Sequence, residues 1–170
     1  VARVRDEAPG AGEAMAVAGV ALARMEVLRD ARLALERALK LQPRQPLATR
    51  TLAAVYLGLG ESDRGLACLQ SAAALVPRDP RPWVAMGRVY LDLGETDKAR
   101  TVYAEALQRD PTNVEARVGA IEALVTLNRL DEAANALAAA LPEIPDNPRL
   151  LGLAARRARE SGENNEARSF

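Results

Sequence analysis

Five prolines divide this chain at a fixed interval. Pro9, Pro43, Pro77, Pro111 and Pro145 each stand 34 residues after the one before. A period of this length is typical of solenoids, in which one supersecondary unit repeats and buries its apolar face against its neighbours. The sequence therefore predicts a stack of similar units, and it favours a function in recognition over a function in catalysis.

The composition favours helices and gives no overall charge. Hydrophobic residues make up 49% of the 170 residues but aromatic residues only 3%, so the predicted core is built of small side chains that suit close helix packing. Lysine plus arginine equals aspartate plus glutamate at 23 each. Because no net field attracts a polyanion, we expect neither a nucleic-acid partner nor insertion into a membrane.

Aligning the prolines divides the chain into repeats. The predicted ranges are 12–45, 46–79, 80–113, 114–147 and a shortened 148–170, preceded by 1–11 as the tail of an earlier repeat. Val1 and Val4 stand in register with Leu35 and Ala38, and the closing GENNEARSF would begin a second helix. We therefore expect one continuous solenoid domain that is a fragment of a longer array.

Local signals place two helices in each repeat. Pro46, Pro80 and Pro148 each follow a polar residue, which is a strong start signal for a first helix. The stretches LGLGESD and LDLGETD put a glycine at a helix exit and predict Ser62 or Thr96 as the cap of the second helix. Each repeat is therefore predicted to be a helical hairpin.

The third repeat has the most regular pattern of large and small residues. It carries Trp83, Met86, Gly87, Tyr90, Gly94, Ala99, Tyr103, Ala106 and Pro111. This pattern resembles the tetratricopeptide repeat, and nearly the whole chain follows it with mild departures, such as Glu26 in place of the turn glycine of the first repeat. The resemblance implies an all-α, right-handed superhelical solenoid of antiparallel helical hairpins.

The resemblance also implies a binding surface, because first helices of this family line a concave groove that holds peptides. The corresponding positions here are Arg50, Leu57, Arg81, Val84, Arg88, Leu91, Glu115, Val118, Glu122, Val125, Arg149 and Arg156. Spacings of three and four residues put each set on one helix stripe, with an apolar floor between rows of charge. The arginines either contact a ligand or pair with Glu115 and Glu122 in the neighbouring repeats.

The chain lacks the residues of common catalytic and metal sites. It has no histidine, which excludes imidazole acid–base catalysis, histidine metal sites and histidine-dependent nucleophiles within it. Cys68, the one cysteine, lies on an alanine-rich second helix and is predicted to be a core residue. Trp83 fits the same interpretation better than that of an exposed anchor. We expect no enzyme activity, no cofactor and no metal.

These observations predict a non-catalytic scaffold that binds a protein or peptide segment in the concave groove. The alternative is a spacer arm in a bacterial envelope or polysaccharide-secretion machine, whose functional domain lies elsewhere. No apolar run in the sequence approaches the roughly 20 residues that span a bilayer. Cytoplasmic and periplasmic locations both stay open, as does the oligomeric state.

Overall fold

The computed structural model describes residues 10–162, and every regular element in that range is a helix. In chain order the helices are α1 (Ala11–Arg24), α2 (Leu28–Leu41), α3 (Pro46–Gly58), α4 (Ser62–Leu75), α5 (Arg81–Asp92), α6 (Thr96–Arg109), α7 (Val114–Thr126), α8 (Leu130–Ala140) and α9 (Pro148–Glu160). The all-α prediction is confirmed. The predicted tail of an earlier repeat, apart from its last two residues, and the helix predicted after Gly162 lie outside the described residues.

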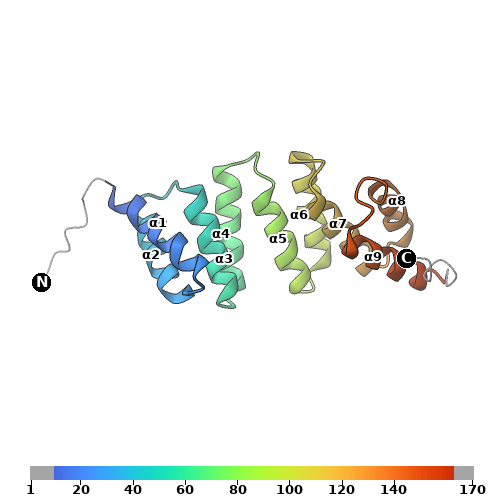
Figure 1. Cartoon of the computed structure of the whole chain (residues 1–170), viewed down its shortest axis with the longest axis horizontal. Helices are drawn as coiled ribbons and strands as arrows, with labels where there is room; N and C mark the ends of the chain where they lie inside the picture. Colours follow the sequence, from blue (N-terminus) through green and yellow to red (C-terminus); the bar gives the residue numbers. More distant parts are fainter. Residues whose placement is uncertain (1–9, 163–170) are drawn as a thin grey trace, which may run out of the picture. The chain divides into compact units, whose positions relative to one another are not determined.

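The helices form two compact units, residues 1–78 and residues 79–170. In the first unit α1 packs on α2 and α3, while α3 also packs on α2 and α4; Figure 1 shows these four helices side by side. In the second unit α7 contacts α5, α6, α8 and α9. Within each unit a first helix therefore touches the next first helix, as α1 touches α3, α5 touches α7 and α7 touches α9. The prediction of one continuous domain stays a prediction.

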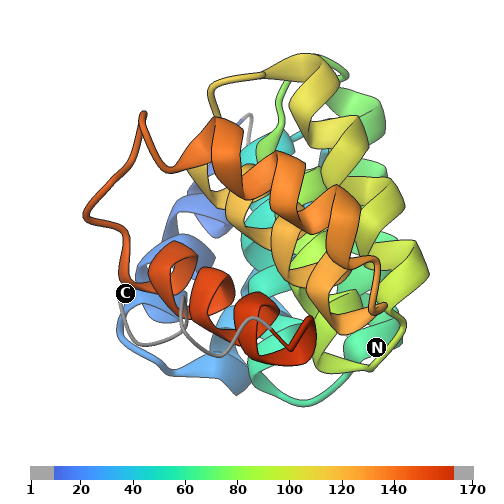
Figure 2. The same ribbon diagram turned by 90° about the vertical axis from the view of Figure 1, so that its right-hand side faces the viewer.

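Each unit has its own apolar core. In the first unit it includes Leu35, Leu52 and Val55, each at most 5% exposed. In the second unit one cluster surrounds Tyr103 and another joins α7, α8 and α9 around Leu150. Figure 2 shows the loop that leads from α8 to α9, and Ile144 of this loop packs against the second cluster. Small alanines fill much of both cores, as the composition predicts.

Two residues discussed from the sequence lie at the edges of these cores. Trp83 is half-buried against the cluster around Tyr103, and the Arg109 guanidinium stacks over its ring at 4.3 Å. Cys68 is half-buried against the core of the first unit. Burial raises the pKa of the Cys68 thiol, which disfavours the reactive thiolate. Both side chains serve packing, as predicted.

The helix starts differ from the prediction by one residue in three places. Ser62 and Thr96 are the first residues of α4 and α6, so the capping positions belong to Glu61 and Glu95, which make no side-chain cap hydrogen bond. Pro80 occupies the capping position of α5 rather than its first turn. The prediction of Ser62 and Thr96 as caps is therefore wrong, because the tight preceding turn brings the chain into the helix one residue earlier.

The turn inside each hairpin uses a left-handed residue. Gly60 and Gly94 have φ of 78° and 73°, and Glu26 and Asn128 adopt the same region at 60° and 56°. A residue other than glycine or asparagine is strained in this conformation. Glu26 nevertheless keeps the turn geometry of the first repeat, which the sequence had left as its least regular feature.

The Tyr103 ring of α6 fixes the spacing between α5 and α7. Tyr103 is 0% exposed, and its ring lies against Gly87 of α5 and Gly119 of α7. A Cβ atom built on Gly87 would come within 2.6 Å of the ring, and one built on Gly119 would overlap its Cζ atom. Only glycine at both positions admits a ring of this size between the two helices.

We predict that Gly119→Ala destabilises the second unit, because the added methyl group overlaps the Tyr103 ring. Overpacking of this kind costs about 1–3 kcal/mol. Gly152→Ala on α9 is the matched control, since a Cβ atom there meets nothing within 4 Å and alanine in a helix gains about 0.5–1 kcal/mol over glycine. Urea unfolding followed by circular dichroism measures both changes; equal effects of the two substitutions would contradict the packing described.

Candidate functional site

The twelve predicted surface positions lie on the first helices of the hairpins. Arg50 and Leu57 are on α3, and the other ten are on α5, α7 and α9. Both α3 residues are half-buried. Because α5 contacts α7 and α7 contacts α9, the ten residues of the second unit share neighbouring helices and form one candidate site.

The predicted apolar floor is largely core. Val84 is 5% exposed, Val118 2% and Val125 1%, so the prediction that these valines offer surface to a ligand is wrong. Each packs within a hydrophobic cluster of the second unit. The spacing of three and four residues did not predict this burial, because a residue at the edge of a helix stripe turns inward wherever neighbouring first helices touch. Leu91 stays half-buried.

Two ion pairs join neighbouring first helices in the second unit. Arg88 of α5 lies 3.4 Å from Glu115 of α7, and Arg149 of α9 lies 2.6 Å from Glu122 of α7. The paired residues are 27 positions apart in sequence, which is one repeat less two helical turns. The pairs therefore run diagonally from one first helix to the next.

The remaining two arginines of the second unit pair close to their own positions. Arg81 holds Asp79 through its Nε atom at 2.8 Å, and Arg156 holds Glu160 one turn later on α9, also at 2.8 Å. All four predicted arginines of this unit therefore have carboxylate partners.

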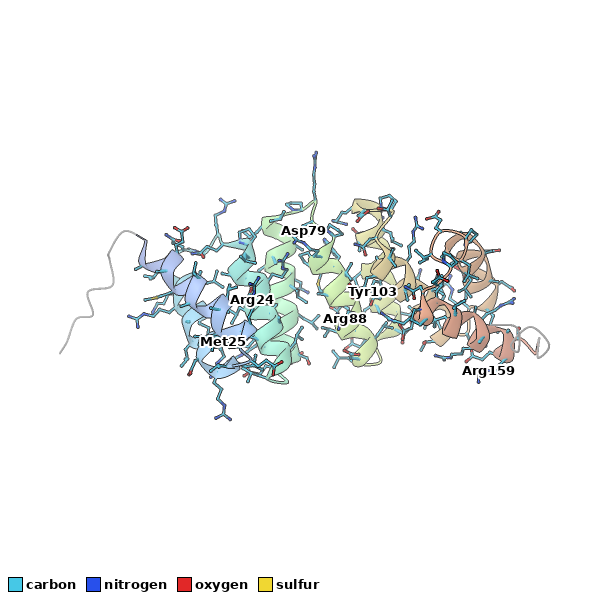
Figure 3. The ribbon with its side chains drawn as sticks, viewed as in Figure 1. Arg24, Met25, Asp79, Arg88, Tyr103 and Arg159 are labelled. Carbon is cyan, nitrogen blue, oxygen red and sulfur yellow. The ribbon has the colours of Figure 1, made fainter. Side chains whose placement is uncertain are left out.

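The Tyr103 hydroxyl is a polar group of this region that the sequence prediction assigned only to packing. It has no hydrogen-bond partner among residues 10–162. Burial, with a smaller contribution from Glu122, raises the pKa of Tyr103 above its ordinary value. Figure 3 labels Tyr103 and Arg88 in the second unit. A glycine inside α7 was the signal for this close packing, since glycine costs helix stability unless another group approaches the backbone.

The first unit offers a different surface. A hollow of about 430 Å³ lies between α1 and α3. Two of its apolar side chains are well exposed, Val17 at 66% and Leu47 at 56%. Its lining consists of Glu13, Ala16, Val17, Val20, Arg44, Gln45, Pro46, Leu47 and Ala48. None of these nine residues is among the twelve positions predicted from the sequence.

The charged residues do not form a metal site in the described part of the chain. No group of three or more histidine, cysteine, aspartate or glutamate side chains comes together within residues 10–162. Within the same range, no helix is both long and apolar enough to cross a membrane. The arrangement offers apolar contact, ion pairs and the buried Tyr103 hydroxyl, which are means of binding.

We predict that the pair Arg88–Glu115 couples weakly, because its side chains are 66% and 47% exposed. A double-mutant cycle of Arg88→Ala and Glu115→Ala should give about 0.2–1 kcal/mol, which falls as salt is added. A cycle of Lys98→Ala with Glu115→Ala is the control, since Lys98 pairs with Glu95 instead. A coupling above about 2 kcal/mol in the first cycle would assign this pair to the support of the fold.

Solved structures with similar folds come from several proteins. The chain aligns with a tetratricopeptide repeat protein from Parabacteroides merdae at 19% identity and a TM-score of 0.81, covering 97% of this chain and 64% of that one. MamA of strain AMB-1 aligns at 22% identity and 0.77, covering 92% and 85%. Pseudomonas aeruginosa pilF aligns at 18% and 0.77, covering 93% and 72%. At these identities the likeness concerns the fold.

The family of the chain is assigned by comparison with protein-family models. A comparison with curated protein sequences finds no match. Two family models, each described as a tetratricopeptide repeat, match residues 17–80 and residues 90–157. The matched segments fall on both units and include most of the helical hairpins seen in the structure. The chain belongs to the tetratricopeptide repeat family.

Proposed function

We propose that this chain is a non-catalytic scaffold that binds an extended segment of another protein along its first helices. Repeats of this family generally serve as protein-interaction scaffolds. The observation that carries the proposal is the hollow of about 430 Å³ between α1 and α3. It combines an open apolar surface with a position on first helices.

The hollow has the composition of a binding surface. Val17 and Leu47 stay 66% and 56% exposed, although covering them with an apolar partner group would gain about 25 cal/mol for each Å² removed from water. Glu13 and Arg44 lie in the same lining and supply polar contacts beside the apolar surface. Protein interfaces commonly show this arrangement of an apolar centre with a polar rim.

The second unit contributes charge in a balanced form. Arg88 and Arg149 each have a glutamate partner on α7, so this surface does not attract an acidic segment through net charge. We propose that the exposed charged side chains among the twelve predicted positions contact the partner through directed hydrogen bonds. Apolar side chains of the partner are proposed to anchor in the hollow of the first unit.

We predict that Leu47→Glu weakens peptide binding at least tenfold, about 1.4 kcal/mol, because it places a charge in the apolar hollow. Peptides selected from a displayed random library on the wild-type chain supply the ligands, and fluorescence polarisation measures their affinity. Leu33→Glu on α2 is the matched control, since Leu33 is 58% exposed and Leu47 56%, and it should leave binding within about twofold.

Circular dichroism checks that both variants keep the fold. A library that yields no binder to the wild-type chain would contradict the proposal. So would selected peptides whose affinity falls with Leu33→Glu and survives Leu47→Glu, because the partner would then lie on second helices.

A further inference from the structure

The Tyr103 hydroxyl stands apart from the other buried tyrosine hydroxyl of the chain. Tyr56 is 8% exposed, and its hydroxyl donates to Glu36 at 2.7 Å. Burial and this hydrogen bond raise the pKa of Tyr56 to about 12. Tyr103 is 0% exposed, and its hydroxyl has no partner in the described part of the chain. A buried unpaired hydroxyl costs stability, so its presence calls for a partner from outside.

The packing of the ring fixes where this hydroxyl points. The Cζ atom, which carries the hydroxyl, lies against Gly87 and Gly119. Glu115 and Glu122 are four residues before and three residues after Gly119 on α7, so they share its helix face. Arg88 follows Gly87 directly on α5. The ring thus passes between two first helices, and its Cζ atom lies beside the face of α7 that bears Glu115 and Glu122.

We name four charged side chains of this surface the charge quartet: Arg88 of α5, Glu115 and Glu122 of α7, and Arg149 of α9. Each contributes to the electrostatic environment of the Tyr103 hydroxyl, and the ring lies against Gly119, whose helix face also bears Glu115 and Glu122. They pair as Arg88 with Glu115 and Arg149 with Glu122. The quartet is neutral, and it offers guanidinium donors and carboxylate acceptors around a buried hydroxyl donor.

The exposure of the quartet leaves room for a ligand to enter. Its side chains are 66% exposed at Arg88, 47% at Glu115, 52% at Arg149 and 34% at Glu122. Exposed pairs of this kind hold together weakly. A ligand group that offers hydrogen bonds to the quartet can therefore move these long side chains apart and reach the hydroxyl.

The chemistry of the quartet selects among ligand groups. A carboxylate would meet the two glutamates, and an ammonium group would meet the two arginines. A neutral amide avoids both repulsions, because its carbonyl oxygen accepts from a hydroxyl or guanidinium and its N–H donates to a carboxylate. Both halves of an amide thus find a partner here.

We infer that the charge quartet and the Tyr103 hydroxyl form a binding site for an amide of an extended peptide segment, whose carbonyl oxygen accepts from Tyr103 and whose N–H donates to Glu115 or Glu122. This inference rests on the proposed function and specifies the chemistry of the first-helix surface in the second unit. The amide belongs either to the peptide backbone or to an asparagine or glutamine side chain.

Three capped peptides distinguish these sources. The probes are acetyl-Ala-Ala-Ala-amide, acetyl-Ala-Gln-Ala-amide and acetyl-Ala-Glu-Ala-amide, titrated into protein with ¹³C-labelled tyrosine. The glutamine probe should shift the Tyr103 signals saturably and leave those of Tyr56 unchanged, while the glutamate probe should bind at least threefold more weakly. An equal response to the trialanine probe assigns the contact to the backbone, and a weaker response assigns it to the side-chain amide.

Substitution of the hydroxyl supplies the decisive comparison. Tyr103→Phe should weaken the glutamine probe at least fivefold, followed by the amide signal of Gly119, and should leave the thermal unfolding midpoint unchanged or higher. Tyr56→Phe is the matched control, because it removes a hydroxyl that has a partner; it should lower the midpoint and leave probe binding unchanged.

Three results would overturn the inference: a lowered midpoint in Tyr103→Phe with unchanged probe binding, tighter binding of the glutamate probe, or no shift of Tyr103 with any probe. None of these three results concerns the hollow of the first unit. If the selected peptides still depend on Leu47, the proposed function stands and the amide site alone fails.

Discussion

The packing of both units depends on one large buried side chain from each second helix. Leu35, Leu69, Tyr103 and Leu137 occupy equivalent positions 34 residues apart, and none is more than 4% exposed. Leu35 lies against Gly19, as Tyr103 lies against Gly87 and Gly119. Because Tyr103 is buried against both α5 and α7, the spacing of these two first helices follows from its size.

The same contact connects packing to function. Three of the four inserted residues are leucines, whose side chains end within the apolar core. Tyr103 is longer and ends in a hydroxyl, so the contact that spaces α5 and α7 also buries a donor that has no partner among the described residues. The charge quartet above it is neutral and partly exposed, which suits directed hydrogen bonding. The first unit offers apolar contact in its place, through the hollow between α1 and α3.

Much of the fold could be predicted from the sequence, because the proline interval and the small-residue pattern repeat. Side-chain direction was harder to predict. Val84, Val118 and Val125 share a stripe with exposed residues, yet they are buried, since a stripe edge faces inward where first helices touch. The diagonal pairing of Arg88 with Glu115 depends on how α5 and α7 cross, which a linear sequence does not state. The unpaired Tyr103 hydroxyl likewise became visible only when its neighbours were placed.

The position of the Tyr103 ring between α5 and α7 is tested most directly by the nuclear Overhauser effects from this ring in solution. If the ring separates α5 from α7, its protons give strong effects to the α protons of both Gly87 and Gly119. Effects to Gly87 alone would contradict the account, because Tyr103 would then pack within its own hairpin and its hydroxyl would not reach the surface formed by the two first helices.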